Sequence, residues 1–265
     1  MRLTAIIAAS LIGSLAHARD CAPLDYYWSN APFEIYADAS QMDPGLESRV
    51  LLESEKIPGV FREILNRHTP RATMVLSYNP PSQVSWFSSL DPDRLTTSGT
   101  RVEDSAAFVA TRLMAGYYNP ARVARGSSSV NVILHEYGHL VYEALRIEGS
   151  DLHGEFREAS ESFRPWARRH YERNGRSDEE YELMIDHETF AESFAHMYHR
   201  GSTRHFFERD HPDLYAFMTS LESYAVEVLN VAYAFGYEQR CETARLINPD
   251  AWRPQTILNL PEFPE

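Results

Sequence analysis

Apolar positions in the second half of the chain recur with the period of an α-helix. The predicted helices run from Ser129 to Leu145, from about Asp186 to His199 and from Pro212 to Ala234. Ser128 or Ser129 is the expected N-cap of the first of these helices, and Gly201 is the expected end of the second. The segment between the first two, residues 156–171, has a partly helical and polar pattern that Pro165 interrupts. Helices therefore dominate the second half.

The first half has short apolar runs that are typical of strands. The pattern predicts strands at Phe33–Ala37 and Ala72–Tyr78, a helix over Leu46–Asn66, and a hairpin of Ala106–Tyr118 with Ala121–Ala124, joined at Asn119-Pro120. Strands that precede helices indicate an α+β fold, with a small mixed sheet followed by a mainly helical half. Because no repeat and no Gly/Ser/Pro-rich linker divides residues 19–265, we expect one domain there.

The charge of the chain narrows the class of partners. The sequence holds 25 Lys+Arg against 38 Asp+Glu, a formal net charge of −13. Such a balance disfavours binding to the phosphate backbone of nucleic acid or to anionic lipid. We therefore expect no nucleic-acid partner.

The N-terminus has the pattern of a secretory signal peptide. Met1-Arg2 is followed by an apolar run from Leu3 to Leu15 and by Ala16-His17-Ala18, an A-x-A cleavage site. We expect residues 1–18 to be removed and the mature protein to be secreted or periplasmic. A retained membrane anchor is the alternative, which the run disfavours because it is shorter than the roughly 20 residues that a span needs.

The mature chain contains two cysteines, Cys21 near its start and Cys241 near its end. Outside the cytosol a disulfide between them would be stable and would join the two ends of the domain. Two free, buried thiols are the alternative, since a sequence cannot show that two Cα atoms lie within bonding range.

The segment His135-Glu136-Tyr137-Gly138-His139 carries the clearest chemistry in the sequence. Positions four apart share one face of a helix, so His135 and His139 can bind the same metal ion while Glu136 flanks it. This H-E-x-x-H arrangement is typical of zincins, in which the glutamate is the general base. The segment lies mid-helix in an apolar stretch, where these three side chains would be costly to bury without a partner.

A catalytic zinc ion needs a third protein ligand and an open position for water. Tyr142 and Leu145 stand where metzincins have a glycine and a histidine, which excludes that class. Glu188 and Glu192 lie one turn apart on the second predicted helix, so that one can bind zinc while the other hydrogen-bonds to a ligand histidine. The spacing favours Glu188 but leaves an exchange of the two roles open.

Two histidines nearby are alternative ligands. His187 is adjacent to Glu188, and His196 lies one turn beyond Glu192. Histidines in such positions are more often surface residues or partners at a helix end.

Over about Ala106 to Phe235 the chain resembles the anthrax lethal factor-like metallopeptidases, a family that includes the clostridial Pro-Pro endopeptidases. The resemblance rests on H-E-Y-G-H, on E-T-F-A-E at Glu188–Glu192, and on Tyr181 about two helical turns before Glu188. It implies a zincin-like fold, Glu188 as the third zinc ligand, Glu192 behind a ligand histidine, and Tyr181 as a donor to the metal-bound oxyanion. A surface tyrosine is the alternative for Tyr181, because acidic residues surround it.

The expected activity is hydrolysis of peptide bonds by a zinc-activated water, with Glu136 as general base, in a monomer that acts on peptides or proteins. The site would be that of a gluzincin, a zincin with a downstream glutamate ligand. A secreted zinc-binding module without catalysis is the alternative, against which the presence of Glu136 argues. We expect substrate contacts from Arg122–Ser129 and from the region near Trp86.

Overall fold

A four-stranded mixed sheet forms one layer of the protein. The computed structural model describes residues 33–35, 45–68, 72–123 and 129–234. The strands are β1 (Phe33–Ile35), β2 (Thr73–Leu76), β3 (Ala107–Ala110) and β4 (Ala115–Tyr118). Their order is β1-β2-β4-β3; β1 and β4 run parallel to β2, whereas β3 is antiparallel to β4 and lies at an edge of this sheet.

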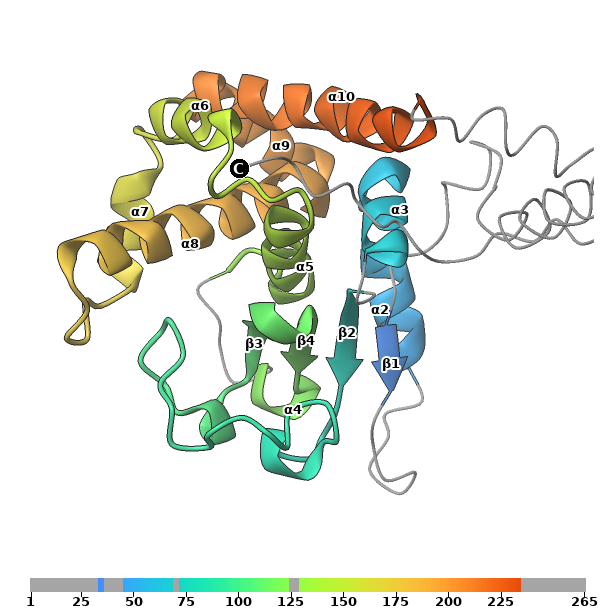
Figure 1. Ribbon diagram of the computed structural model, residues 1–265, viewed down its shortest axis with the longest axis vertical. Coiled ribbons are helices and arrows are strands. Elements are labelled where there is room, and N and C mark those ends of the chain that lie inside the picture. Colours follow the sequence, from blue (N-terminus) through green and yellow to red (C-terminus); the bar gives the residue numbers. More distant parts are fainter. Residues whose placement is uncertain (1–32, 36–44, 69–71, 124–128, 235–265) are drawn as a thin grey trace, which may run out of the picture.

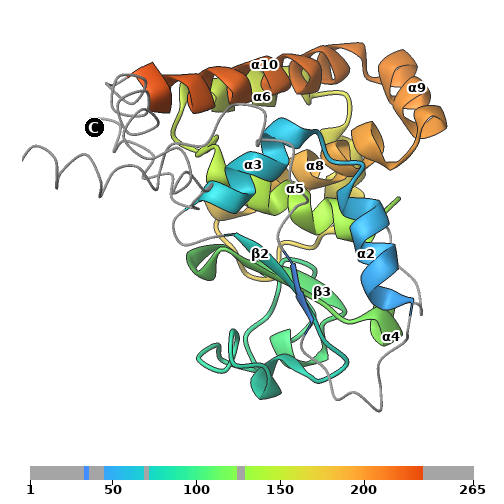
Figure 2. The same cartoon turned by 90° about the vertical axis from the view of Figure 1, so that its right-hand side faces the viewer.

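Helices cover the sheet and form the second half of the chain (Figures 1 and 2). Their bounds are α2 Leu46–Ser54, α3 Gly59–Arg67, α4 Pro120–Val123, α5 Val132–Ala144, α6 Asp151–Ala159, α7 Arg164–His170, α8 Asp178–His199, α9 Gly201–Asp210 and α10 Pro212–Ala234. Helix α5 packs on β3 and β4 on one side and along α8 on another, and α10 lies across α3, α6, α8 and α9. The expected α+β class is confirmed, and so are the bounds of the last predicted helix.

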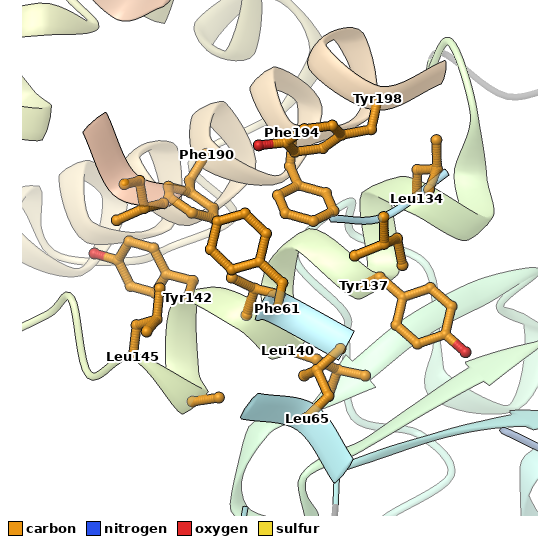
Figure 3. Packing of buried hydrophobic residues seen from close by; sticks show 14 of the residues in the cluster. Phe61, Leu65, Leu134, Tyr137, Leu140, Tyr142, Leu145, Phe190, Phe194 and Tyr198 are labelled. Atoms are coloured by element: carbon orange, nitrogen blue, oxygen red, sulfur yellow. The ribbon is translucent and has the colours of Figure 1, made fainter. Parts of the chain in front are cut away.

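The largest apolar cluster lies where α3, α5 and α8 meet. Figure 3 shows Phe61 of α3 facing Phe190 and Phe194 of α8, with Leu140 and Tyr142 of α5 beside them. The rings of Phe61 and Phe194 meet edge to face with centroids 5.7 Å apart, and those of Tyr142 and Phe190 at 5.1 Å. Aromatic pairs in this geometry hold neighbouring helices in a defined packing.

The helix predicted over Leu46–Asn66 is two helices. Helix α2 ends at Ser54, and Pro58 precedes α3 in an extended conformation, with φ −50° and ψ 137°. Proline lacks an N–H group and disfavours helical geometry in the residue before it, so the chain breaks there although the apolar period continues.

The sequence predicted a hairpin with its turn at Asn119-Pro120. The structure does contain a hairpin, formed by β3 and β4, but its turn lies earlier in the chain. Both strands lie within the first predicted segment and reverse at residues 111–114, where Met114 adopts the left-handed conformation with φ 48°. Pro120 begins the short helix α4 instead. The side-chain oxygen of Asn119 accepts hydrogen bonds from the N–H groups of Ala121 and Arg122, as an N-cap does.

Two predicted helix starts were also wrong. Asn131, not Ser128 or Ser129, caps α5, since its side chain accepts a hydrogen bond from the N–H of Leu134. Helix α8 begins at Asp178, eight residues before the expected start, because Ser177 and Glu180 form a capping box. The predicted end of this helix at His199 is confirmed: the extended Arg200 is its C-cap, and Gly201, which begins α9, follows at the C′ position.

Two predictions concern residues outside the described ranges. The signal peptide at residues 1–18 and the pair Cys21–Cys241 fall there, so both stay predictions. Among the described residues, no helix combines the length and the apolar character that a membrane span requires.

Candidate metal centre

Helix α5 carries the two histidines and the glutamate of the H-E-x-x-H motif into the interior. His135, Glu136 and His139 are 6%, 5% and 8% exposed. Apolar residues surround them on every turn of α5, which explains why a helix with three ionisable side chains is buried. The Asn131 cap is itself held by Glu53 of α2, whose carboxylate accepts from the Asn131 amide at 2.5 Å. The start of α5 is thus fixed against the first half of the chain.

Helix α8 brings a carboxylate from the other side. Where the two helices cross, a Cβ added to Gly138 would lie 2.8 Å from the Cα of Ala191. Only glycine permits this close approach, because any side chain would meet the backbone of α8. The crossing places Glu188, 1% exposed, opposite the two histidines.

Three donor atoms meet at this crossing. The Nε2 atoms of His135 and His139 are 3.2 Å apart, and Glu188 Oε2 lies 3.2 Å from the first and 3.6 Å from the second. In a tetrahedral zinc site with bonds of 2.0–2.1 Å, neighbouring donors are about 3.3–3.4 Å apart. Two imidazoles and one carboxylate at these distances therefore fit zinc. Among the described residues, no other group of three His, Cys, Asp or Glu side chains has the geometry of a metal site.

Glu192 lies behind the first histidine. Its Oε2 is 3.0 Å from His135 Nδ1, and its Oε1 accepts a hydrogen bond of 2.9 Å from the N–H of Val130. A carboxylate on Nδ1 fixes the tautomer that leaves Nε2 free to bind a metal. The structure thus brings Glu188 to the donor group and Glu192 to the position behind it.

The two alternative histidines lie away from the donor group. His187 contacts Glu148 at 3.2 Å, and His196 lies 3.4 Å from the outer oxygen of Glu192.

The charges of the cluster favour a cation. Burial by itself lowers the pKa of His135, but hydrogen bonds with Glu188 and Glu192 outweigh it and raise this pKa well above its usual value. Burial opposes the charge of Glu188 too, yet His139 and His135 hold its pKa well below the usual range. Positive charge is therefore stabilised between these carboxylates.

Glu136 differs from the other two glutamates. Burial raises its pKa, and the nearby histidines only partly offset this effect. Its Oε2 atom is buried and has no hydrogen-bond partner within the described part of the chain. A buried carboxylate oxygen without a partner is rare, and it is an observation that a functional role would explain.

A buried ion cluster holds α8 in place just before Glu188. Asp186 is fully buried and pairs with Arg157 of α6 at 2.6 Å, with His153 at 3.1 Å and with Arg164 of α7. Three helices are thus joined two residues from the metal donor. Burial and the charge of Arg157 lower the pKa of His153 despite its contact with Asp186, whose charge the arginines already balance.

The donor group opens onto a cleft of about 920 Å³. One wall is the edge strand β3 with residues 111–113, the opposite wall is the start of α8 with Tyr171, and residues 89–100 form a third side. Residues 89–100 contact the segment that precedes α8, where Arg176 donates a hydrogen bond to the carbonyl of Thr96 at 3.3 Å. Gly99, with φ 80°, lies so close to Asn174 that a Cβ would be 2.6 Å from its amide.

The predicted substrate segment Arg122–Ser129 contributes Val123 and Ser129 to the cleft wall, whereas Arg122 and Trp86 do not line the cleft. Arg122 donates instead to the carbonyls of Glu103 and Ser105, and Trp86 belongs to the small cluster under β3. Residues 124–128 lie outside the described ranges. An exposed edge strand could have been anticipated only if the turn at residues 111–114 had been recognised.

Tyr181 is turned away from the donor group. Its hydroxyl donates to the main-chain carbonyl of Tyr171 at 3.2 Å, because the turn before α8 folds the first turn of this helix against the end of α7. The tyrosine that lines the cleft together with Glu188 is Tyr171. Burial and the charge of Glu188 raise the pKa of Tyr171. No pattern in the sequence pointed to this residue.

Two histidines and a glutamate on crossed helices, beside a small mixed sheet, are the arrangement of a zincin-like fold. Residues 92–221 match the family model described as anthrax toxin lethal factor, N- and C-terminal domain. Through this part the chain is similar to the anthrax lethal factor-like family of zinc metallopeptidases.

The fold is also similar to that of a solved structure, the PRO-PRO endopeptidase (PPEP-2) from Paenibacillus alvei. The TM-score is 0.52 and the sequence identity 17%, over 71% of this chain and 96% of that one. At this identity the likeness concerns the fold. No curated protein matched the sequence.

Proposed function

We propose that this protein is a zinc-dependent endopeptidase of the gluzincin type. The observation that carries the proposal is the unpartnered Oε2 of Glu136, buried beside three metal donors at the base of a cleft. When bound by His135, His139 and Glu188, zinc supplies Lewis-acid polarisation of the scissile carbonyl and lowers the pKa of a water ligand.

Glu136 is the general base in this proposal. Its carboxylate takes the proton of the attacking water and returns it to the leaving amine, steps that typically contribute about 10²–10⁴-fold to the rate. A pKa raised by burial suits this role, since a base works best when its pKa approaches the working pH. Glu192 holds His135 in the tautomer that presents Nε2.

The edge strand β3 supports a peptide as the substrate. Its residues line the cleft and pair with β4 on one side, so the other side of the strand offers backbone groups to an extended chain. An extended peptide that adds to such an edge gains main-chain hydrogen bonds along its length. The sequence of the substrate would then be selected by side chains around the cleft.

We also propose that the hydroxyl of Tyr181 donates to the oxyanion that forms on the scissile carbonyl. This role requires a change from the position that the hydroxyl has in the structure. The hydroxyl must leave the carbonyl of Tyr171 to reach a reacting carbonyl. Loss of an oxyanion donor costs about 10²–10³ in kcat, so Tyr181→Phe should lower kcat by that factor with zinc still bound. A variant with normal kcat would remove Tyr181 from the mechanism.

The test of the function compares Glu136→Gln with the wild type. Both proteins are loaded with one equivalent of zinc and assayed on quenched peptide libraries, beginning with peptides that contain Pro-Pro because the similar solved structure is a Pro-Pro endopeptidase. Glu136→Gln should keep its zinc and lose about 10²–10⁴ in kcat. Glu143→Gln, on the same helix but outside the cleft wall, is the matched control and should cleave normally.

Two outcomes would contradict the proposal. Normal turnover by Glu136→Gln would exclude the assigned base. Stoichiometric zinc in a wild-type protein that cleaves no peptide would favour a non-catalytic zinc-binding module.

We also propose that the protein is exported with removal of residues 1–18, as the Ala16-His17-Ala18 site indicates. Expression of the full chain in a bacterial host and N-terminal sequencing of the periplasmic product should give Arg19 as the first residue. A product that retains Met1 would contradict this. Thiol titration of the same product tests Cys21–Cys241, for which we expect no free thiol.

A further inference from the structure

Residues 94–102 fold into a small hairpin at one side of the cleft, called the 94–102 hairpin below. Leu95 and Arg101 form an antiparallel bridge. Closer to the turn, the N–H of Thr96 donates to the carbonyl of Thr100 at 2.8 Å. The hairpin therefore has a defined backbone, although most of its residues are exposed.

Two contacts join the tip of the 94–102 hairpin to the turn before α8. Arg176 donates to the carbonyl of Thr96 at 3.3 Å, a hydrogen bond between residues 80 apart in the sequence. Gly99 lies directly against the side chain of Asn174, and both residues have a positive φ, 80° and 47°. The position of the hairpin is thus set by a tertiary contact and not only by its own hydrogen bonds.

Leu95 is an exposed apolar residue that lines the cleft. It is 48% exposed, and it belongs to none of the apolar clusters that the described residues form. The other large apolar residues that are exposed in the described part of the chain, Leu52, Phe206 and Val226, do not line the cleft. Packing of the core therefore does not explain where Leu95 lies.

An exposed leucine in a cleft offers a contact that the donor end of the same cleft does not. The side chains there are ionisable: His135, Glu136, His139 and Glu188. Covering apolar surface with another apolar group is favourable, because both surfaces are removed from water. Ligand sites commonly combine such apolar contacts with a few polar groups that fix orientation. An apolar side chain of a bound peptide would therefore be stabilised at Leu95.

We propose that Leu95 is a specificity-determining residue that contacts an apolar side chain of the peptide substrate, and that the contact between Arg176 and the 94–102 hairpin holds Leu95 at the cleft. The inference rests on the proposed endopeptidase function. It adds the class of side chain that the substrate carries.

The test uses pairs of peptides that differ at one position, where one carries leucine and the other serine. Each position of a peptide that the zinc-loaded wild type cleaves is substituted in turn, and the wild type should prefer leucine at one of them. Leu95→Ser should lower this preference in kcat/KM by about 3–10-fold, mostly through KM, because about half of the leucine surface is left for the substrate to cover. Leu95→Met keeps an apolar side chain of similar volume and should retain most of the preference.

Leu52→Ser is the matched control. Leu52 lies on α2 outside the cleft and is 60% exposed, so the same substitution removes a similar apolar surface and should keep the preference of the wild type. Binding of the same peptide pairs to the Glu136→Gln protein, measured by fluorescence anisotropy, should show the difference between leucine and serine without turnover.

Three results would overturn the role of Leu95. The wild type might cleave leucine and serine peptides equally at every position, Leu95→Ser might keep the full preference for leucine, or Leu52→Ser might lose as much of it as Leu95→Ser does. A zinc-loaded wild type that cleaves no peptide would instead contradict the proposed function on which the inference rests.

Discussion

Gly138 sets the distance between the two helices that carry the metal donors. In Gly138→Ala the new Cβ would lie 2.8 Å from the Cα of Ala191 and 3.1 Å from its carbonyl oxygen, whereas ordinary contact begins at 3.4 Å. The atoms it meets belong to the backbone of α8 and cannot rotate away. The two helices must therefore separate by about 0.6 Å at their crossing.

The magnitude follows from two opposing effects. Overpacking a close-packed interior costs about 1–3 kcal/mol. Alanine is favoured over glycine inside a helix by about 0.8–1 kcal/mol. Gly154→Ala on α6 has only the second effect, because a Cβ there would have no atom within 4 Å. The two variants should therefore differ in their free energy of unfolding by about 1–3 kcal/mol, with Gly138→Ala the less stable.

Zinc binding should report the same movement. A shift of 0.6 Å between α5 and α8 exceeds the tolerance of about 0.5 Å within which functional groups must be held. Zinc affinity should fall about tenfold or more in Gly138→Ala and stay unchanged in Gly154→Ala. The assays are urea unfolding of the metal-free proteins and competition with a chelator.

The reasoning would be refuted if Gly138→Ala were as stable as Gly154→Ala and bound zinc as tightly as the wild type. The backbone of α8 could then yield without cost, and the glycine of the motif would not determine the geometry of the site.

Three further predictions concern the residues around the donors. Glu192→Gln removes the charge behind His135 and should lower zinc affinity about tenfold, measured by the same competition. Asp186→Asn removes the fully buried charge that pairs with the buried Arg164 and with Arg157, and it should cost about 3–5 kcal/mol in urea unfolding, whereas Asp93→Asn, in an exposed ion pair, should cost at most about 1 kcal/mol. The lowered pKa of His153 means that the unfolded chain binds its proton more readily, so stability falls as the pH drops below about 6.5, the usual value for histidine. Unfolding at pH 7.5 and 5.5 should show this loss in the wild type and a smaller one in His153→Gln; equal losses would contradict it.

Local patterns predicted the elements that carry the site. The apolar period of α5 and the four-residue spacing of His135 and His139 determine that both rings lie on one face, whatever the rest of the fold does. The same holds for α10, whose predicted bounds match the structure. A period of 3.6 is a property of a few consecutive residues, so it can be recognised in the sequence.

Helix ends and turns were predicted less well, because single side chains decide them. Asn131 caps α5 through one hydrogen bond, which two nearby serines could equally have offered. Met114 takes a left-handed conformation that few residues other than glycine adopt, so the hairpin turn had no recognisable signal. Pro58 breaks a helix whose apolar pattern continues on both sides.

The sequence by itself determined which residue types carry the chemistry: two histidines and a glutamate on one helix, and two further glutamates one turn apart on another. Only the tertiary structure decided that Glu188 lies next to the Nε2 atoms of both histidines, while Glu192 contacts Nδ1 of His135. It also decided that Tyr171 lines the cleft onto which the donors open. The physical reason is that spacing along one helix is fixed by its own geometry, whereas distances between helices depend on how closely they pack, here at Gly138.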